Sequence, residues 1–131
     1  MKYMLLVYLK EGVLNETERE HCYEESLQLV DDIRAKGQYL AAAPLHPTST
    51  ATSVRVREGK RLVTDGPFAE TREQLGGYYL IDVDNLDDAI AVAARIPGAR
   101  VGTVEVRPVI ELAGLAEHSS TTERHHERST A

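Results

Sequence analysis

Apolar and polar residues alternate along the chain with two different periods, and these periods predict strands and helices. Residues 3–9 are almost continuously apolar, which predicts a strand in the middle of a sheet. Residues 16–36 carry apolar side chains three and four positions apart, which predicts a long amphipathic helix. Asn15 with Glu18 matches a capping box at the start of this helix, and Gly37 matches its end.

Two helices with apolar faces are predicted to pack on the sheet. On the first helix, two neighbouring rows form a wide stripe: Tyr23, Leu27, Val30 and Arg34, and beside them Cys22, Ser26, Leu29 and Ile33. The second helix starts at the N-cap Asn85, has Asp88 in the capping-box position and ends at the Ile96-Pro97-Gly98 segment. Its predicted buried face contains Leu86, Ala89, Ile90, Ala93 and Ala94.

The remaining segments predict five more strands, two of which form a hairpin. They are residues 38–43, residues 52–57 and 60–64 joined by a tight turn at Glu58-Gly59, residues 76–83, and residues 103–110. The order is strand–helix–strand–hairpin–strand–helix–strand. It predicts an α+β fold, the ferredoxin-like βαββαβ unit with an inserted β-hairpin.

One face of the predicted sheet lacks a cover. The helices of a βαββαβ unit lie on one face, while residues 3–9 and 78–83 are apolar on both faces. Such an open face is too apolar to remain in water. We therefore expect a homodimer through the sheet faces, which is a symmetric, barrel-like α+β dimer.

Composition narrows the class of protein. The chain has 131 residues, 42% hydrophobic and 27% charged, and this fits one globular domain. We expect that domain to span residues 1–112 and to be followed by a disordered polar tail, residues 113–131. A net charge of −6 argues against nucleic-acid binding. Cys22 is alone and no apolar stretch is long enough to span a membrane, so a cytoplasmic protein is expected.

The segment 65–74 admits two readings. As a turn, Asp65-Gly66-Pro67 ends a strand, Phe68 fills the core, and Thr71 with Gln74 opens a short helical turn. As a site, the carboxylates Asp65, Glu70 and Glu73 stand beside Arg72, and crowded carboxylates can serve as acid and base. Both readings stay open at the level of the sequence.

Further candidates lie outside that segment. His46 stands in a loop between two prolines and is either a general base or a plain loop residue. The candidate catalytic residues are therefore Asp65, Glu70 and His46, and the candidate ligand-binding residues are Asp65, Phe68, Glu70, Arg72 and Tyr8. No His or Cys residues have the spacing of metal ligands, and no phosphate-binding loop is present, so neither a metal nor a cofactor is expected.

The run "DGPFAETREQLGGYYLID" closely resembles the signature of the DGPF branch of the YCII-related family. The runs "MKYMLLVY" and "AARIPGARVGTVEVRPVIE" extend the resemblance over residues 1–112. It implies a ferredoxin-like dimeric α+β barrel, but no known activity for this branch. Some YCII-related proteins use a His on the first helix and an Asp before a Pro. Here these positions hold Ser26 and Ile96, which puts that chemistry in doubt.

Two functions are expected from the residues and the resemblance. The first is a small-molecule site in a cleft beside the sheet, including a lyase- or isomerase-like enzyme that acts on a small aromatic or acidic compound. The alternative is a non-catalytic accessory module that partners a sigma-factor-type transcription regulator. The resemblance allows the alternative because DGPF proteins are often encoded near such regulators or fused to them.

Overall fold

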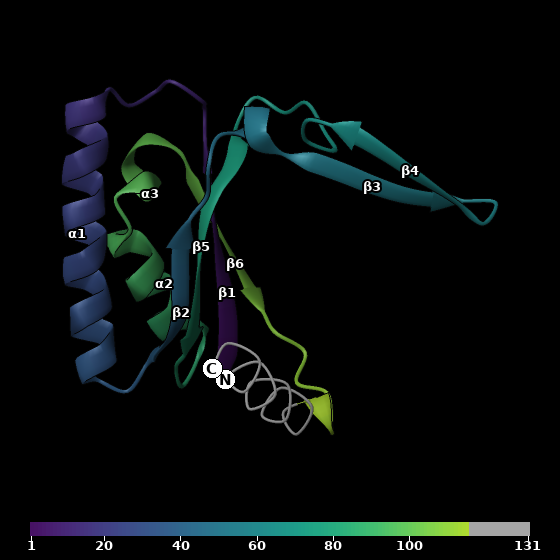
Figure 1. The fold of residues 1–131 in the computed structure, drawn as a ribbon. Helices are drawn as coiled ribbons and strands as arrows, with labels where there is room; N and C mark the ends of the chain where they lie inside the picture. Colours follow the sequence, from purple (N-terminus) through teal and green to yellow (C-terminus); the bar gives the residue numbers. More distant parts are fainter. Residues whose placement is uncertain (116–131) are drawn as a thin grey trace, which may run out of the picture.

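The computed structural model describes residues 1–115, and its centre is a four-stranded antiparallel sheet (Figure 1). The strands are β1 (Lys2–Leu9), β2 (Tyr39–Pro44), β5 (Gln74–Asp82) and β6 (Thr103–Pro108), in the order β2-β5-β1-β6. The two central strands pair antiparallel, with Leu5 opposite Tyr79. This strand order is that of the ferredoxin-like unit, so the predicted α+β fold class is confirmed.

Three helices lie on one face of the sheet (Figure 1). They are α1 (Glu16–Ala35), α2 (Leu86–Arg95) and the short α3 (Gly98–Val101). The predicted caps are present. Asn15 and Glu18 exchange both hydrogen bonds of a capping box, and the Asn85 side chain accepts from the Asp88 backbone N–H at 2.9 Å. Only α3 was not predicted. It forms because Pro97 has a helical backbone, with φ −53° and ψ −35°, which suits the first turn of a helix.

The core lies between this sheet and the helices. Alternate residues of the two central strands point into it, as the pleat of a strand requires. The buried apolar side chains include Tyr3, Leu5 and Val7 of β1, Tyr79 and Ile81 of β5, Leu29 and Ile33 of α1, and Ala89, Val92 and Ala93 of α2. The other set of β1 residues, Met4, Leu6 and Tyr8, is partly exposed on the opposite face of the sheet.

The predicted apolar stripes of the helices were too wide. Tyr23 and Leu27 of α1 are exposed, because a helix on a sheet touches it along one narrow band and α1 presents Leu29 and Ile33. Leu86 is also exposed, because α2 packs through small residues and Val92. Hydrophobicity alone did not fix the rotation of either helix about its axis.

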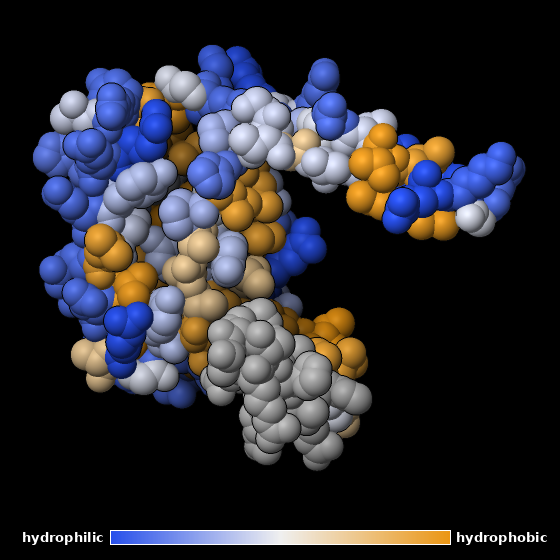
Figure 2. All heavy atoms as spheres, viewed as in Figure 1, coloured by the Kyte–Doolittle hydropathy of each residue, from blue (hydrophilic) through white to orange (hydrophobic). Residues whose placement is uncertain are grey.

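The predicted hairpin is confirmed and projects from the fold. Strands β3 (Thr52–Arg57) and β4 (Lys60–Asp65) form a separate two-stranded sheet, preceded by the 3₁₀ turn η1 (Thr48–Thr50). Glu58 and Gly59 both have positive φ, which is the backbone of a tight hairpin turn. We call residues 52–65 the arm. It leaves the sheet on the side away from the helices (Figure 1), and apolar residues lie exposed along it (Figure 2).

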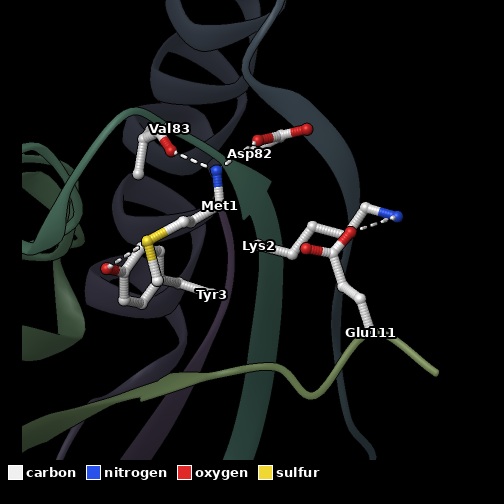
Figure 3. Close-up of polar contacts among 6 residues, drawn as sticks. All are labelled: Met1, Lys2, Tyr3, Asp82, Val83 and Glu111. Atoms are coloured by element: carbon white, nitrogen blue, oxygen red, sulfur yellow. Dashed lines mark hydrogen bonds and ion pairs between the residues drawn. The ribbon is translucent and has the colours of Figure 1, made fainter.

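Polar contacts hold the chain start at the sheet end opposite the arm (Figure 3). The Met1 ammonium group lies 3.1 Å from the Asp82 carboxylate and donates to the Val83 carbonyl at 2.7 Å. Lys2 pairs with Glu111 at 3.5 Å. These contacts are exposed and stabilise little. The predicted tail lies outside the described residues from residue 116 onward, and within residues 1–115 no helix has the length and apolarity to cross a membrane.

The contrast between core and exposed leucines gives a stability prediction. Leu29→Ala should lower the free energy of unfolding by about 2–5 kcal/mol, because it leaves a cavity between α1 and the sheet. Leu86→Ala removes the same atoms from an exposed position and should cost less than about 1 kcal/mol. Urea denaturation measures both values. Equal losses would contradict the rotation of α2 described above.

Candidate functional site

The segment 65–74 is a turn that closes the root of the arm. Gly66 has φ +98°, a conformation that side chains other than glycine rarely adopt. Its N–H donates to the Ala51 carbonyl at 2.7 Å, and the Ser53 hydroxyl donates to the Gly66 carbonyl at 2.8 Å. The two strands of the arm are thus joined at their base, and the predicted sharp corner is present.

Phe68 does not fill the core, so that prediction was wrong. Its side chain is 76% exposed, and the Arg55 guanidinium lies 5.1 Å from the ring centroid. The physical reason is the arm. Phe68 follows a hairpin that projects beyond the sheet, away from α1, α2 and α3, which form the core with the sheet. The stacked pair is an exposed cation–π contact of modest strength.

The predicted helical turn after Phe68 is also absent. The Thr71 hydroxyl donates to the Glu73 carbonyl at 2.5 Å, and the Gln74 side-chain amide donates to the Thr71 carbonyl at 2.8 Å. These side chains hold an irregular bend, and Gln74 already begins β5. Thr71 and Gln74 therefore form hydrogen bonds other than those of a capping box, and no helix begins at this place.

The predicted site residues share one end of the sheet without forming a cluster. Within residues 1–115, no hydrogen bond or ion pair joins the exposed side chains of Asp65, Glu70 and Arg72 to one another. His46 is exposed in the loop after β2. Tyr8 is partly buried on the uncovered face of the sheet, opposite Thr103.

Two other carboxylates at this end have structural contacts. The Glu73 carboxylate accepts from the Thr103 hydroxyl at 2.9 Å and links the start of β5 to β6. The Glu11 carboxylate accepts from the Thr48 N–H at 2.8 Å and from its hydroxyl at 2.6 Å, which lowers the pKa of Glu11. Glu11 thereby connects the loop after β1 to η1 and to the arm. The fixed carboxylates at this end are thus structural, while Asp65 and Glu70 remain exposed.

A second group of polar side chains, missed at the level of the sequence, lies between α1 and the sheet. Tyr79 of β5 is only 6% exposed and points toward the helices. Burial raises the pKa of its phenol, and a hydrogen bond with the Ser26 hydroxyl offsets part of that rise. Like any phenol with an ordinary or raised pKa, Tyr79 is neutral at neutral pH and can donate a hydrogen bond. The phenol and the hydroxyl are a polar pair inside an otherwise apolar layer.

Charged residues stand at the edge of this pair. Arg100 of α3 donates to the Glu25 carboxylate of α1 at 2.7 Å. Cys22 lies near both, and burial raises the pKa of its thiol, followed by the effect of Glu25. We call this group the α1–α3 cluster; it consists of Cys22, Glu25, Ser26, Tyr79 and Arg100. Its residues come from three elements, so sequence spacing alone does not bring them together.

A second ion pair also joins the two helical segments. Arg95 at the end of α2 binds the Asp32 carboxylate of α1, and Gln28 donates to the same carboxylate at 3.1 Å. Both contacts lower the pKa of Asp32, with the Arg95 hydrogen bond the larger cause. The α2–α3 segment is therefore tied to α1 at two places. Both ties are exposed, so either can open at modest cost.

An apolar hollow lies on the other side of the α2–α3 segment. Its volume is about 270 Å³, and its lining contains Ile90, Ala93, Ala94, Ala99, Val104 and Val106. Binding sites combine an apolar lining with a few polar groups that orient the ligand. The hollow has the apolar lining but no polar side chain in it. By itself it can therefore accept an apolar group without orienting it.

The positions that correspond to the His–Asp pair of some YCII-related proteins have other roles here. Ser26 contacts the Tyr79 phenol. Ile96 is 2% exposed and fills the core beside α2. Hydroxyl groups and a guanidinium are therefore the polar groups at this place, and an imidazole–carboxylate pair is absent from these two positions.

Two substitutions at the root of the arm should differ in how much stability they cost. Gly66→Ala should destabilise the fold by about 1–2 kcal/mol, because alanine is strained at φ +98°. Phe68→Ala should cost less than about 1 kcal/mol, because only an exposed cation–π contact is lost. Urea denaturation measures both. A loss of about 3 kcal/mol or more for Phe68→Ala would identify it as a core residue.

Comparisons with known proteins identify the family and the fold. The model of the YCII-related domain matches residues 1–113. An uncharacterised protein of Rhizobium meliloti (strain 1021) is 38% identical over 118 residues, covering 83% of this chain and 92% of its own. The solved 5-chloro-2-hydroxyhydroquinone dehydrochlorinase of Burkholderia phenoliruptrix, in complex with 2,5-dihydroxybenzoquinone, has a TM-score of 0.52 at 11% identity. That likeness covers 86% of this chain and 96% of the dehydrochlorinase, and it concerns the fold alone. The chain belongs to the YCII-related family.

Proposed function

We propose that this protein binds a small aromatic or acidic compound beside the sheet, at the α1–α3 cluster, and that it acts as a lyase- or isomerase-like enzyme. The observation that carries the proposal is the buried Tyr79, which faces α1 beside Ser26 and close to the Arg100–Glu25 pair. Buried polar pairs with shifted pKa values gather at functional sites. The likeness of fold to a dehydrochlorinase solved with a dihydroxybenzoquinone supports the class of ligand.

The chemistry of the cluster suits an oxygen-rich ring. The Tyr79 phenol is protonated at neutral pH, so it can donate a hydrogen bond to a hydroxyl or keto oxygen. Ser26 supplies a second hydroxyl, and Arg100 supplies a positive charge for an ionised group. Because Arg100 pairs with Glu25 across the two helices, a ligand must separate this exposed pair to enter.

Calorimetric titration with 2,5-dihydroxybenzoquinone as the probe tests this proposal. Tyr79→Phe and Ser26→Ala should each weaken binding about tenfold, because each removes one hydrogen bond to the ligand. Tyr78→Phe is the matched control, because Tyr78 is the adjacent strand residue and points to the other face of the sheet. Absence of binding by the wild type, or equal binding by Tyr79→Phe, would contradict the proposal.

The root of the arm is the other place at which this function could reside. The predicted residues there are Asp65, Phe68, Glu70 and Arg72, with His46 and Tyr8 at the same end of the sheet. In the same titration, Asp65→Asn separates the two places. Loss of binding by Asp65→Asn with an unchanged melting temperature would move the site to the arm. Unchanged binding leaves it at the α1–α3 cluster.

We further propose a homodimer in which the uncovered faces of two sheets pack together. Met4 and Leu6 of β1 lie on that face, with Tyr78 and Leu80 of β5 beside them by strand register. Apolar side chains in the centre of an open sheet favour burial against a second sheet. The DGPF branch and a cytoplasmic location remain proposals, supported by the motif and by the single cysteine. The sigma-factor-type partner stays a prediction, because neither the fold nor the relatives bear on it.

Leu6→Lys should convert the dimer to a monomer, because a charge in the centre of the paired sheets would be buried without a partner. Light scattering after size-exclusion chromatography measures the mass. Ile90→Lys is the control, because Ile90 is exposed on the helical side of the sheet. A Leu6→Lys protein with the same mass as the wild type would exclude this interface.

A further inference from the structure

The arm presents an apolar face that no other segment of residues 1–115 covers. Val54 lies opposite Val63 by strand register, and Val56 lies two residues further along the same face. Val54 and Val56 are 60% and 62% exposed, and Val63 is also exposed. A two-stranded hairpin alone is only marginally stable in water. The valines therefore indicate that another surface covers the arm.

The arm also differs from the rest of the chain in charge. The arm, residues 52–65, contains Arg55, Arg57, Lys60 and Arg61 against Glu58 and Asp65, which is +4 and −2, a net charge of +2. The whole chain carries −6, so the remaining residues carry −6 − 2 = −8. A basic, apolar arm on an acidic body favours an acidic surface as its partner.

An exposed side of α1 has the matching properties. Tyr23 and Leu27 form a short exposed apolar stripe, one turn apart. Glu20 and Glu24 lie one turn before them, and both are exposed. The helix as a whole contains seven Asp and Glu residues against two Arg residues. Apolar side chains flanked by acids complement the valine face of the arm, on which Arg61 lies opposite Val56.

A chain cannot make this contact with itself. The arm leaves the sheet on the side opposite its own α1 (Figure 1). A second copy packed face to face brings its α1 to the side toward which the arm points. Each strand of the arm has six residues, which at about 3.3 Å per residue spans about 20 Å. Stacked sheets lie about 10 Å apart, so the arm is long enough to pass the partner sheet and reach the helical layer behind it.

We propose that in the dimer the arm of each copy docks on the Tyr23–Leu27 stripe of α1 of the other copy. A second copy of this chain thus provides the surface that covers the apolar arm, and the contact occurs twice by symmetry. This inference rests on the proposed dimer. It adds a reason for the inserted hairpin: the hairpin clasps the partner, and its basic residues select the acidic helix.

Sedimentation equilibrium of a double variant tests the apolar part of the contact. Val54→Thr with Val56→Thr keeps β-branched side chains in the strand but adds hydroxyl groups to the docked face. Four valines are affected in the symmetric dimer, so its dissociation constant should rise about 100-fold. Val13→Thr, an exposed valine of the loop after β1, is the control and should leave the dissociation constant unchanged.

Charge exchange tests the identity of the docking surface. Arg57→Glu with Arg61→Glu should weaken the dimer, and so should Glu20→Lys with Glu24→Lys. All four changes in one chain should restore affinity, because the reversed arm then meets a reversed helix. Failure of this rescue would overturn α1 as the docking surface.

The outcomes separate the two proposals. If the wild type is a monomer, both the dimer and the docked arm are wrong. If the wild type is a dimer that Leu6→Lys dissociates, while the arm variants leave its dissociation constant unchanged, only the docked arm is wrong. Weakening by the valine changes together with rescue by the fourfold charge exchange supports both.

Discussion

Burial of one face of the sheet by α1 and α2 is the interaction on which the rest of the structure depends. Leu5 and Ile81 at the centre of the sheet are fully buried, and Leu29 and Ile33 cover them from α1. The pleat that points these side chains inward must point their neighbours to the other face. Within residues 1–115, the two long helices both lie on the first face, so the second face is left without a helical cover.

The same packing places the polar groups proposed to act. Tyr79 faces the helices because it lies in register with Leu5, and Ser26 faces the sheet because it lies one turn from Leu29. The Tyr79 phenol lies at this layer, and the Ser26 hydroxyl of α1 is near enough to lower its pKa. Arg100 lies at the edge because Pro97 starts a new helical turn directly after α2. Position in the fold, more than any local motif, defines the α1–α3 cluster.

Local signals predicted the elements well, and tertiary contacts decided the rest. Asn15 and the hairpin turn at Glu58 are determined by neighbouring residues, so they could be predicted from the sequence. Phe68 could not, because its exposure depends on where the arm points. The candidate site residues fall into the same two groups, those that stand out in the sequence and those that only the fold identifies. Asp65 stands out by residue type in the sequence, whereas Tyr79 could be distinguished from its neighbour Tyr78 only by the register between strands. The row of α1 that contains Ser26 was the available signal.

In the proposed dimer, a second copy completes the half-covered sheet, with the arm as part of the contact. Amide hydrogen exchange at several protein concentrations tests it most directly, because it reports on each strand separately. The predicted result is that amides of β3 and β4 become more protected as concentration rises, while those of β1 and β5 are strongly protected throughout. Arm amides that exchange rapidly at every concentration, in a protein that remains folded, would contradict it.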